Sequence, residues 1–372
     1  MSFTDGISYN TECRGLLSLH PSLASTLIKT EKITDYYHVE QTPFARGKFA
    51  AVRKCTHKVT GIEYAAKFIR KRRRSMDQRN DICHEIAVLK LAQNCGHIVN
   101  IHEVYETPTE MALVLELVAG GELQRVIDIN DGLEEVQVVH VLQQILKGLR
   151  FLHSNNIAHL DLKPQNLLIT SSYPHCDIKL CDFGISRVIE NGVELREILG
   201  TPDYVAPEVL NFEPISLATD IWSVGVLAYV LLSGYSPFAG DTKQETFCNI
   251  TQCALSFPQD LFSNISDDAR DFIMVTLMPE PNQRINIDEC LDHPWLNNFP
   301  LKSCLNVILP SDNETVYKNS NNGIDTRNKT ETKKYLCPEI CNESEFCNSK
   351  ESERNDISLT SVEVIVDRGI PC

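Results

Sequence analysis

Apolar and polar positions alternate over short distances between residues 36 and 67, and glycines or polar clusters break the runs. This pattern predicts short β-strands. Residues 81–93 instead carry apolar side chains at helical spacing, which predicts a helix. The run ALVLEL at 112–117 predicts a buried strand, followed by a turn at Gly120 and Gly121. The first third of the chain is therefore expected to form a sheet with one helix.

Helical spacing dominates after residue 130. The most apolar run of the chain, at 221–232, is shorter than the roughly 20 residues that a bilayer span needs. We therefore expect a buried core helix there and no membrane span. Ser266 has the residue type of an N-cap for the last long helix. The expected helical segments are residues 135–156, 219–233 and 266–278.

Both ends of the chain are more polar than its middle. Residues 1–32 form a Ser/Thr-rich extension that we expect to be partly disordered, and their one apolar patch, GLLSLHPSLAS, either packs on a surface or stays loose. Residues 300–372 contain few large apolar residues and are expected to be mostly disordered, with a short docking strand as the alternative for the last 16. A single domain over residues 33–299 remains between them.

Composition narrows the function classes. Hydrophobic and charged contents of 42% and 23% are typical of globular proteins. A net charge of −15 argues against a general nucleic-acid binder. The first residues have neither a basic stretch nor an apolar core of a signal peptide, so the fourteen cysteines are expected to be reduced, in the cytoplasm or nucleus. The tail cluster Cys337, Cys341 and Cys347 matches no zinc spacing well.

Five short words follow one another along the chain: YAAK ending at Lys67, HEIAVL with Glu85, HLDLKPQN at 159–166, DFG at 182–184 and APE at 206–208. They resemble the motifs of protein kinases. They occur in the family's order, each on the strand or helix that it requires. The resemblance covers residues 33–299 and implies an α+β, bilobal fold with a small β-rich lobe, a larger helical lobe and ATP between them.

The resemblance implies a role for each polar residue of these words. Lys67 would hold the α- and β-phosphates of ATP and pair with Glu85. Asp161 would accept the proton of the substrate hydroxyl, while Lys163, which marks Ser/Thr kinases, would neutralise the transferring phosphoryl group. Asn166 and Asp182 would hold Mg²⁺, a cation that prefers oxygen ligands.

Further positions would bind the nucleotide or form the scaffold. Glu122 would bind ribose or a basic substrate, with a plain solvated carboxylate as the alternative. Thr201 would bridge Asp161 and Lys163. The remaining nucleotide positions are Ala45 and Gly47 in the phosphate loop, Val52, Ala65 and Leu168 around adenine, Leu115 behind it, and Glu116 and Leu117 on the hinge. The scaffold positions are Asp220 under the catalytic loop, the Glu208–Arg284 pair, and the apolar column of Leu89, Ile101, His159 and Phe183.

The phosphate loop FARGKFAAVRKC departs from the family pattern G-x-G-x-x-G-x-V. Ala45 and Ala50 replace the outer glycines, whereas Gly47 and Val52 are kept. If the first position requires a positive φ, Ala45 costs on the order of 1 kcal/mol of strain. The sequence then predicts an ATP KM raised several-fold.

Two departures concern regulation. Leu160 stands where the family has an arginine that contacts an activation-loop phosphate, and residues 187–200 contain no Ser, Thr or Tyr. A loop held open by packing, active without phosphorylation, explains both.

Several words resemble the death-associated protein kinases, and most closely their DRAK branch, named for apoptosis induction. They include RGKFAAVRKC and ELREILGTPDYVAPEVL. The resemblance implies apoptotic, stress or actomyosin signalling, a monomer or weak dimer, and protein substrates with basic residues near the target Ser/Thr, myosin light chain being a candidate. Gln165, where many such kinases have Glu, predicts weaker selection for a second arginine.

Two further features bear on partners. The segment LNNFPLKSCLNVILP, residues 296–310, has a single lysine, Lys302, so no calmodulin control is expected. The basic run at 70–74 is either a nuclear signal or, as we favour, a surface docking loop.

Two other function classes remain as alternatives. A pseudokinase scaffold with weakened nucleotide binding is supported by Ala45 alone, because Lys67, Glu85, Asp161 and the metal ligands are all present. A small-molecule phosphotransferase is disfavoured by GTPDYVAPE, a peptide-binding platform.

Overall fold

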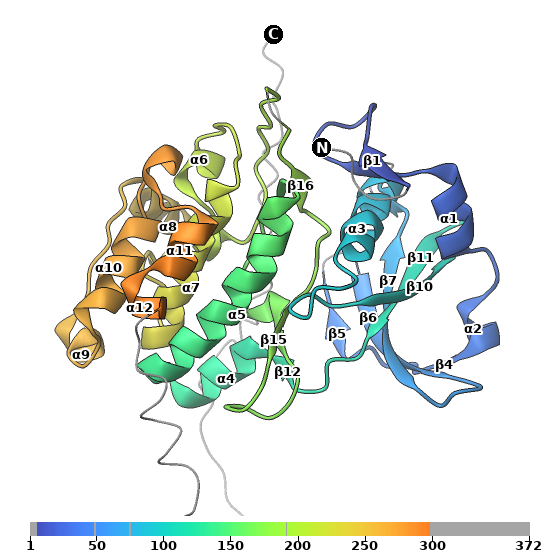
Figure 1. Cartoon of the computed structure of the whole chain (residues 1–372), viewed down its shortest axis with the longest axis horizontal. Coiled ribbons are helices and arrows are strands. Elements are labelled where there is room, and N and C mark those ends of the chain that lie inside the picture. The colour runs from blue at the N-terminus through green and yellow to red at the C-terminus, as the bar shows by residue number, and fades with distance from the viewer. Residues whose placement is uncertain (1–5, 48–49, 74–75, 191, 298–372) are drawn as a thin grey trace, which may run out of the picture. The chain divides into compact units, whose positions relative to one another are not determined.

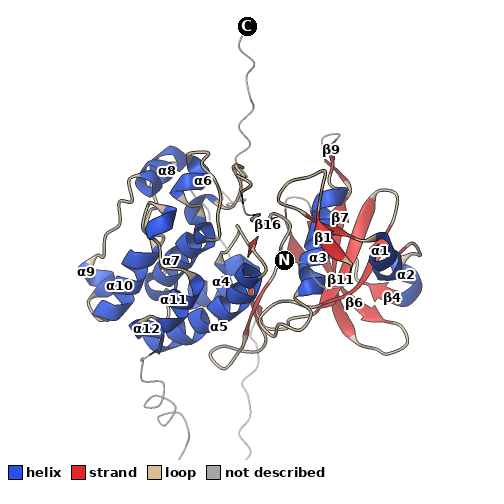
Figure 2. Ribbon diagram, turned by 45° about the horizontal axis from the view of Figure 1, so that its top comes forward, coloured by secondary structure: helices blue, strands red, loops and turns tan. Residues whose placement is uncertain are grey.

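The computed structural model describes residues 6–47, 50–73, 76–190 and 192–297, and the structural statements below concern those residues. A β-rich part precedes a helical part along the chain, as the α+β two-lobed prediction requires (Figures 1 and 2). The expectations for residues 300–372, including the tail cysteines, lie outside the described residues.

One sheet forms the framework of the small lobe. Its strand order is β3-β10-β11-β7-β6-β4, with β5 also pairing β6, and the only parallel pair among these described strands is β3 with β10. α3 (Arg79–Leu91) lies beside this sheet (Figure 1). The strands are β3 (Ile28–Lys29), β4 (Tyr37–Val39), β5 (Ala45–Arg46), β6 (Ala50–His57), β7 (Glu63–Arg70), β10 (Ile101–Glu106) and β11 (Glu110–Glu116).

The basic run forms a small hairpin of its own. β8 (Arg72–Arg73) pairs antiparallel with β9 (Met76–Asp77), just before α3 begins. Both readings of this run, nuclear signal and docking loop, stay open.

The first described residues pack on the small lobe. β1 (Ile7–Tyr9) and β2 (Leu17–Leu19) form an antiparallel hairpin, followed by α1 (Pro21–Leu27) and, after β3, by α2 (Ile33–Tyr36). Leu16 and Leu17 of the apolar patch are buried, and Leu17 joins the main hydrophobic core. Of the two alternatives for this patch, packing is the one that the structure has. The domain boundary at residue 33 stays a prediction.

The core of the helical part is α7 (Ala218–Ser233). Every residue of it from Thr219 onward is buried, as expected for the apolar run at 221–232. It ends at Gly234, whose φ of +77° suits the left-handed position that closes a helix. No helix among the described residues is long and apolar enough to cross a membrane.

The other elements of this part surround α7 and the catalytic loop. Ser266 caps α10 by accepting from the Ala269 N–H, which confirms the predicted N-cap. The helices are α4 (Leu123–Asn130), α5 (Glu135–Ser154), α6 (Pro207–Leu210), α8 (Lys243–Thr251), α9 (Gln259–Phe262), α10 (Asp267–Thr276), α11 (Ile287–Asp292) and α12 (Pro294–Asn297), with 3-10 turns at Pro164–Asn166, Pro202–Tyr204 and Pro281–Gln283. The strands are β12 (Gly121–Glu122), β13 (Ile157–Ala158), β14 (Leu167–Ile169), β15 (Ile178–Leu180) and β16 (Arg187–Val188).

Candidate active site

A charge cluster, buried at Lys67 and Glu85 and half exposed at Asp182, joins the sheet, α3 and the DFG word. Lys67 is in the middle of β7, and its Nζ lies 2.6 Å from Glu85 Oε1 and 2.8 Å from Asp182 Oδ1. The Lys67 and Glu85 side chains are 11% and 3% exposed. The structure thus brings together three of the predicted site residues, from segments far apart in the sequence.

The pKa values of Lys67 and Asp182 are shifted in the directions that keep both side chains charged. Burial alone would lower the pKa of Lys67, but Asp182 and Glu85 outweigh it and raise that pKa above its usual value. Lys67 holds the pKa of Asp182 at about 2. Burial raises the pKa of Glu85, and Lys67 opposes this rise. Lys67 is therefore a fixed cation and Asp182 a fixed anion at neutral pH.

The catalytic loop forms a second polar cluster around Asp161. Thr201 Oγ1 donates to Asp161 Oδ1 at 2.7 Å, and Lys163 Nζ lies 2.8 Å from Asp161 Oδ2. Lys163 also donates to Thr201 Oγ1 at 2.6 Å, which confirms the predicted bridge. Asn166 Nδ2 donates to Asp161 Oδ2 at 2.8 Å. Because both carboxylate oxygens are bonded, the orientation of Asp161 is fixed before a substrate arrives.

Asp220 of α7 holds the backbone of this loop. Its two carboxylate oxygens accept from the N–H groups of His159 and Leu160, each at 2.8 Å. Leu160 has a φ of +65°, a left-handed conformation that costs roughly 1–2 kcal/mol for a residue other than glycine. These two bonds therefore offset backbone strain at the residue next to Asp161.

The predicted metal ligands suit a hard divalent cation. Asp182 offers an ionised carboxylate and Asn166 an amide oxygen, the ligand types that Mg²⁺ takes in nucleotide-dependent enzymes together with phosphate oxygens and water. The described residues contain no group of three or more His, Cys, Asp or Glu side chains that could hold a metal. The residues present fit Mg²⁺, and their assignment as its ligands stays a prediction.

The expected adenine and hinge positions lie on neighbouring strands. Val52 of β6 pairs with Lys67, Ala65 of β7 pairs with Leu115 of β11, and Leu168 of β14 pairs with Glu122 of β12. Leu117 directly follows β11 and is half-buried. Their contacts with a nucleotide stay predictions.

The Glu116 side chain has structural partners on either side of the hinge. Its Oε1 lies 2.6 Å from Lys179 Nζ, and its Oε2 accepts from Asn100 Nδ2 at 3.0 Å. The two contacts fix the side chain, and the Glu116 N–H donates to Asn100 O at 3.0 Å, so a contact of this residue with a nucleotide stays a prediction.

The strain expected at Ala45 is absent. Ala45 lies in β5 and pairs antiparallel with Val52, and Ala45 is not among the described residues that have a positive φ. Extended pairing accepts any L-residue, so the prediction of a weakened ATP grip on this ground was wrong. Gly47 is held by a bond from its N–H to Ala50 O at 2.9 Å, and residues 48 and 49 lie outside the described residues.

We expect Ala45→Gly to leave the KM for ATP within about twofold of the wild type, because no left-handed strain is relieved. Steady-state kinetics at fixed peptide concentration would measure this. A KM lowered several-fold would reinstate the strained loop.

The scaffold contacts predicted from the motif words are present. The His159 and Phe183 rings lie 5.1 Å apart, and both side chains are buried. Glu208 of α6 and Arg284 form a bidentate pair with distances of 2.8 and 2.7 Å. Leu89 and Ile101 are buried as the apolar column requires.

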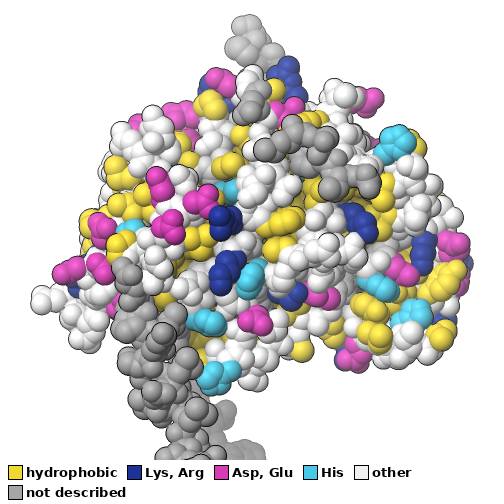
Figure 3. Space-filling model, in the orientation of Figure 1, with side chains coloured by type: hydrophobic (Ala, Val, Ile, Leu, Met, Phe, Trp, Pro, Cys, Tyr) yellow, Lys and Arg dark blue, Asp and Glu magenta, His cyan; other side chains and the backbone are white. Residues whose placement is uncertain are grey.

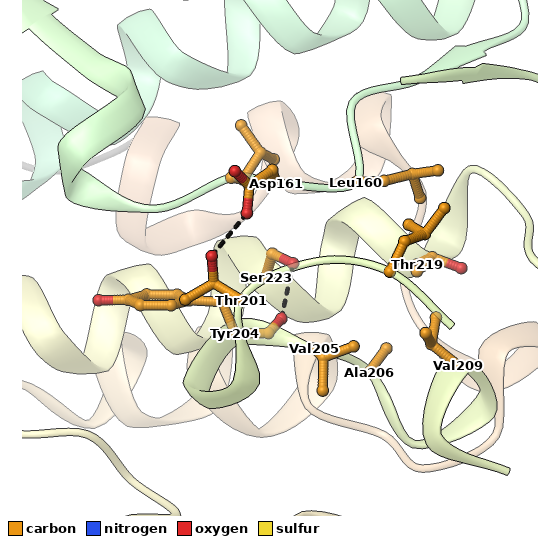
Figure 4. A pocket seen from close by; sticks show the side chains of 11 residues that line it. Leu160, Asp161, Thr201, Tyr204, Val205, Ala206, Val209, Thr219 and Ser223 are labelled. Carbon is orange, nitrogen blue, oxygen red and sulfur yellow. Dashed lines mark hydrogen bonds between the residues drawn. The ribbon is translucent and has the colours of Figure 1, made fainter. Parts of the chain in front are cut away.

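The activation segment is anchored without phosphate. Arg187 donates through Nε and Nη2 to the two oxygens of Glu197, at 3.0 and 2.9 Å, which ties the start of the segment to its end. Leu160, 7% exposed, lines a small cavity with Val205, Val209 and other residues (Figure 4). Sequence reasoning identified the missing phosphosite but not the Arg187–Glu197 pair, because nothing in either residue's neighbourhood marks it.

A second contact missed from the sequence is centred on His84, the residue before Glu85. The buried ring accepts from the Leu17 N–H through Nδ1 at 2.9 Å, and its Nε2 lies 3.0 Å from Ser186 Oγ. Ser186 Oγ in turn donates to Phe183 O at 2.8 Å. One side chain of α3 thus joins the first described residues to the segment just after the DFG word.

We expect this histidine to lower stability in acid. Burial, and next the nearby Arg187 cation, lower the pKa of His84 to about 3, below the usual 6.5. Below pH 6.5 the unfolded chain binds a proton here that the folded protein does not. The contribution is therefore full above pH 6.5 and is lost as the pH falls toward 3.

Between pH 7.5 and 5.5, the free energy of unfolding should fall by about 1.4 kcal/mol more in the wild type than in His84→Leu. Urea unfolding of both proteins at the two pH values measures the difference. Equal losses would show that His84 is already charged in the folded protein.

Charges are mixed on the surface. On the face shown in Figure 3, Lys and Arg side chains of the described residues are interspersed with Asp and Glu and form no continuous basic surface.

Comparisons with known proteins agree with this geometry. A family model described as "Protein kinase domain" matches residues 38–296. A Drosophila melanogaster protein named "Death-associated protein kinase related" is 56% identical over 285 residues, which are 76% of this chain and 42% of that protein. The chain thus matches less than half of that relative's length.

Two further relatives are covered more completely. "Serine/threonine-protein kinase 17A" of Oryctolagus cuniculus is 54% identical over 74% of this chain and 70% of that protein. "Death-associated protein kinase 2" of Mus musculus is 45% identical over 72% of this chain and 73% of its own length.

Proposed function

Since the chain belongs to the protein kinase family, and within it to the death-associated protein kinases and their relatives, we propose that it is an active serine/threonine kinase. It would transfer the γ-phosphoryl group of ATP to Ser or Thr of proteins. One observation carries the proposal. The Lys67–Glu85 pair and the Asp161–Lys163–Thr201 cluster are both assembled in one structure. A scaffold that had lost catalysis would have no need of both.

Proton removal falls to Asp161. Its carboxylate is held by Thr201 and Asn166, and it would accept the proton as the substrate hydroxyl attacks the γ-phosphorus and the bond between that phosphorus and the ADP oxygen breaks. Because the carboxylate is already oriented, little reorganisation is needed at the moment of reaction.

Charge neutralisation falls to two lysines. Lys163, next to Asp161, would balance negative charge on the phosphoryl group in transfer, and Lys67 would bind the other phosphates. Glu85 keeps Lys67 directed at the site. Asp182 and Asn166 would hold Mg²⁺, which would neutralise part of the phosphate charge.

The direct test is turnover with ATP and Mg²⁺ on a serine peptide that has arginines before the serine, beside the same peptide with tyrosine in that place. We expect phosphate transfer to serine and none to tyrosine. No transfer to either peptide by folded protein would favour the pseudokinase alternative.

We propose that the enzyme needs no activation-loop phosphate. Two features support this. The Arg187–Glu197 pair anchors the segment as a phosphate would, and the buried Leu160 stands where the arginine that binds such a phosphate would be.

Treatment of purified protein with a broad phosphatase should therefore leave kcat within about twofold, because no hydroxyl lies between Ser186 and Thr201. Peptide kinetics before and after treatment, with mass spectrometry of residues 185–205, make the measurement. Loss of activity together with a phosphate mapped to that segment would contradict the expectation.

The substrates are proposed from the same family. We expect proteins with basic residues near the target Ser or Thr, myosin light chain among the candidates, in apoptotic, stress or actomyosin signalling in the cytoplasm or nucleus. Gln165 donates to Gln124 Oε1 at 3.0 Å and brings no negative charge of its own, which supports weak selection for a second arginine.

A further inference from the structure

The first described segment contacts two parts of the active site at once. We refer to residues 6–29, from the β1–β2 hairpin to β3, as the N-terminal clasp. One contact is with α3, where the Leu17 N–H donates to His84 Nδ1. The other is with the activation segment, where Gly15 O accepts from the Val188 N–H at 2.8 Å.

The clasp is packed into the fold at both of its ends. Leu17 is completely buried, and Ile7 and Leu16 are nearly so. At its other end, β3 pairs with β10, and Lys29 Nζ lies 2.7 Å from Glu103 Oε1. Burial of side chains of this size contributes roughly 1.5–3 kcal/mol each, so the clasp is held with enough free energy to influence what it touches.

The contact at His84 acts on Glu85 through helix geometry. Successive residues of an α-helix differ by about 100° around the axis, so the two side chains point in different directions from one rigid turn. Holding His84 from Leu17 on one side and Ser186 on the other fixes the rotation of α3. That rotation decides whether Glu85 reaches Lys67.

The contact at Gly15 acts on the loop that carries Asp161. Val188 belongs to β16, which pairs with β13, and β13 leads directly into His159 and the catalytic loop. Gly15 has a φ of +74°, and a side chain there would approach Leu195 and Arg187 of the activation segment to 3.0 and 3.2 Å. The glycine permits the close approach.

We infer that the N-terminal clasp holds α3 and the activation segment in their catalytic arrangement, with His84 as a positioning residue for Glu85. The clasp thereby supplies what an activation-loop phosphate supplies elsewhere. This inference rests on the proposed kinase function and extends it to a source of activation within the chain.

The experiment compares variants of the full-length chain. His84→Leu removes the acceptor for Leu17 and the donor to Ser186, and Gly15→Ala crowds the contact between the clasp and the Leu195 and Arg187 side chains of the activation segment. Gly61→Ala is the matched control, since Gly61 also has a positive φ, of +70°, but has nothing within 4 Å of an added side chain. His84→Asn keeps an acceptor close to the position of Nδ1.

Dissociation constants for a fluorescent ATP analogue, kcat and peptide KM are measured well below each unfolding midpoint. We expect His84→Leu and Gly15→Ala to weaken nucleotide binding about fivefold to tenfold and to lower kcat, with peptide KM unchanged. His84→Asn should recover most of the affinity, and Gly61→Ala should match the wild type.

Two results would overturn the inference. Unchanged nucleotide affinity and kcat, with only a lower unfolding midpoint, would make the clasp a stabilising cover. An effect of His84→Leu without one of Gly15→Ala would confine the role to the helix and exclude the clasp. A wild type without turnover would refute the proposed function instead, while the nucleotide affinities would still decide on the clasp.

Discussion

Replacing Asp161 with alanine is expected to lower kcat by at least about 10²-fold and up to about 10⁴-fold, with the KM for ATP nearly unchanged. The range is that of a lost general base. ATP binding should persist because Lys67 and Glu85, 2.6 Å apart, do not depend on Asp161. An interaction needed only in the transition state lowers kcat and kcat/KM together.

Two companion variants separate charge from shape. Asp161→Asn keeps an oxygen that accepts from Thr201 but cannot take a proton, and it should lose nearly as much activity as alanine. Asp267→Ala, at a side chain that is 98% exposed on α10, should keep full activity. Turnover by Asp161→Ala equal to that of the wild type would mean that another group removes the proton, or that the measured activity belongs to a contaminant.

Replacing Arg284 with methionine is expected to lower the free energy of unfolding by about 3–5 kcal/mol, because it leaves the Glu208 carboxylate buried without its partner. The Arg284 and Glu208 side chains are 0% and 1% exposed. The guanidinium also donates to three backbone carbonyls, so its loss leaves these three acceptors without this hydrogen bond. Against a typical total stability of about 5–15 kcal/mol, this is a large share.

Urea unfolding followed by circular dichroism measures the loss, and the chain provides its own control. Arg150 Nε lies 2.8 Å from Asp288 Oδ1, but the two side chains are 58% and 62% exposed. Arg150→Met should therefore cost under about 1 kcal/mol. Similar losses in the two arginine variants would show that burial does not govern the strength of the Glu208–Arg284 pair.

The motif words predicted the centre of the site because they combine residue type with spacing. Lys67, Glu85, Asp161 and Asp182 are charged groups whose chemistry is recognisable from the sequence, and the structure brings them into the two clusters that this chemistry needs. The Asp220 and Glu208–Arg284 contacts follow the same pattern of fixed words in fixed order.

What the sequence could not supply depends on backbone geometry and distant partners. His84 bonds a main-chain N–H 67 residues away and a hydroxyl 102 residues away, and neither partner has a motif of its own. Ala45 seemed strained because glycine is usual there, whereas its pairing with Val52 keeps it extended. The apolar patch GLLSLHPSLAS left both packing and a loose segment open, because the residues that it packs against are distant in the sequence.

The activation segment has a consequence for how this kinase could carry information. A phosphorylated loop is a record, since it stays switched on after its signal has gone and is erased only by a phosphatase. Residues 187–200 contain no side-chain hydroxyl that could be phosphorylated, and in the folded chain the Arg187–Glu197 pair joins the two ends of the segment. Under our proposal that the enzyme needs no activation-loop phosphate, its activation loop stores no record of past signals, and its activity follows the amount of folded protein present at that moment.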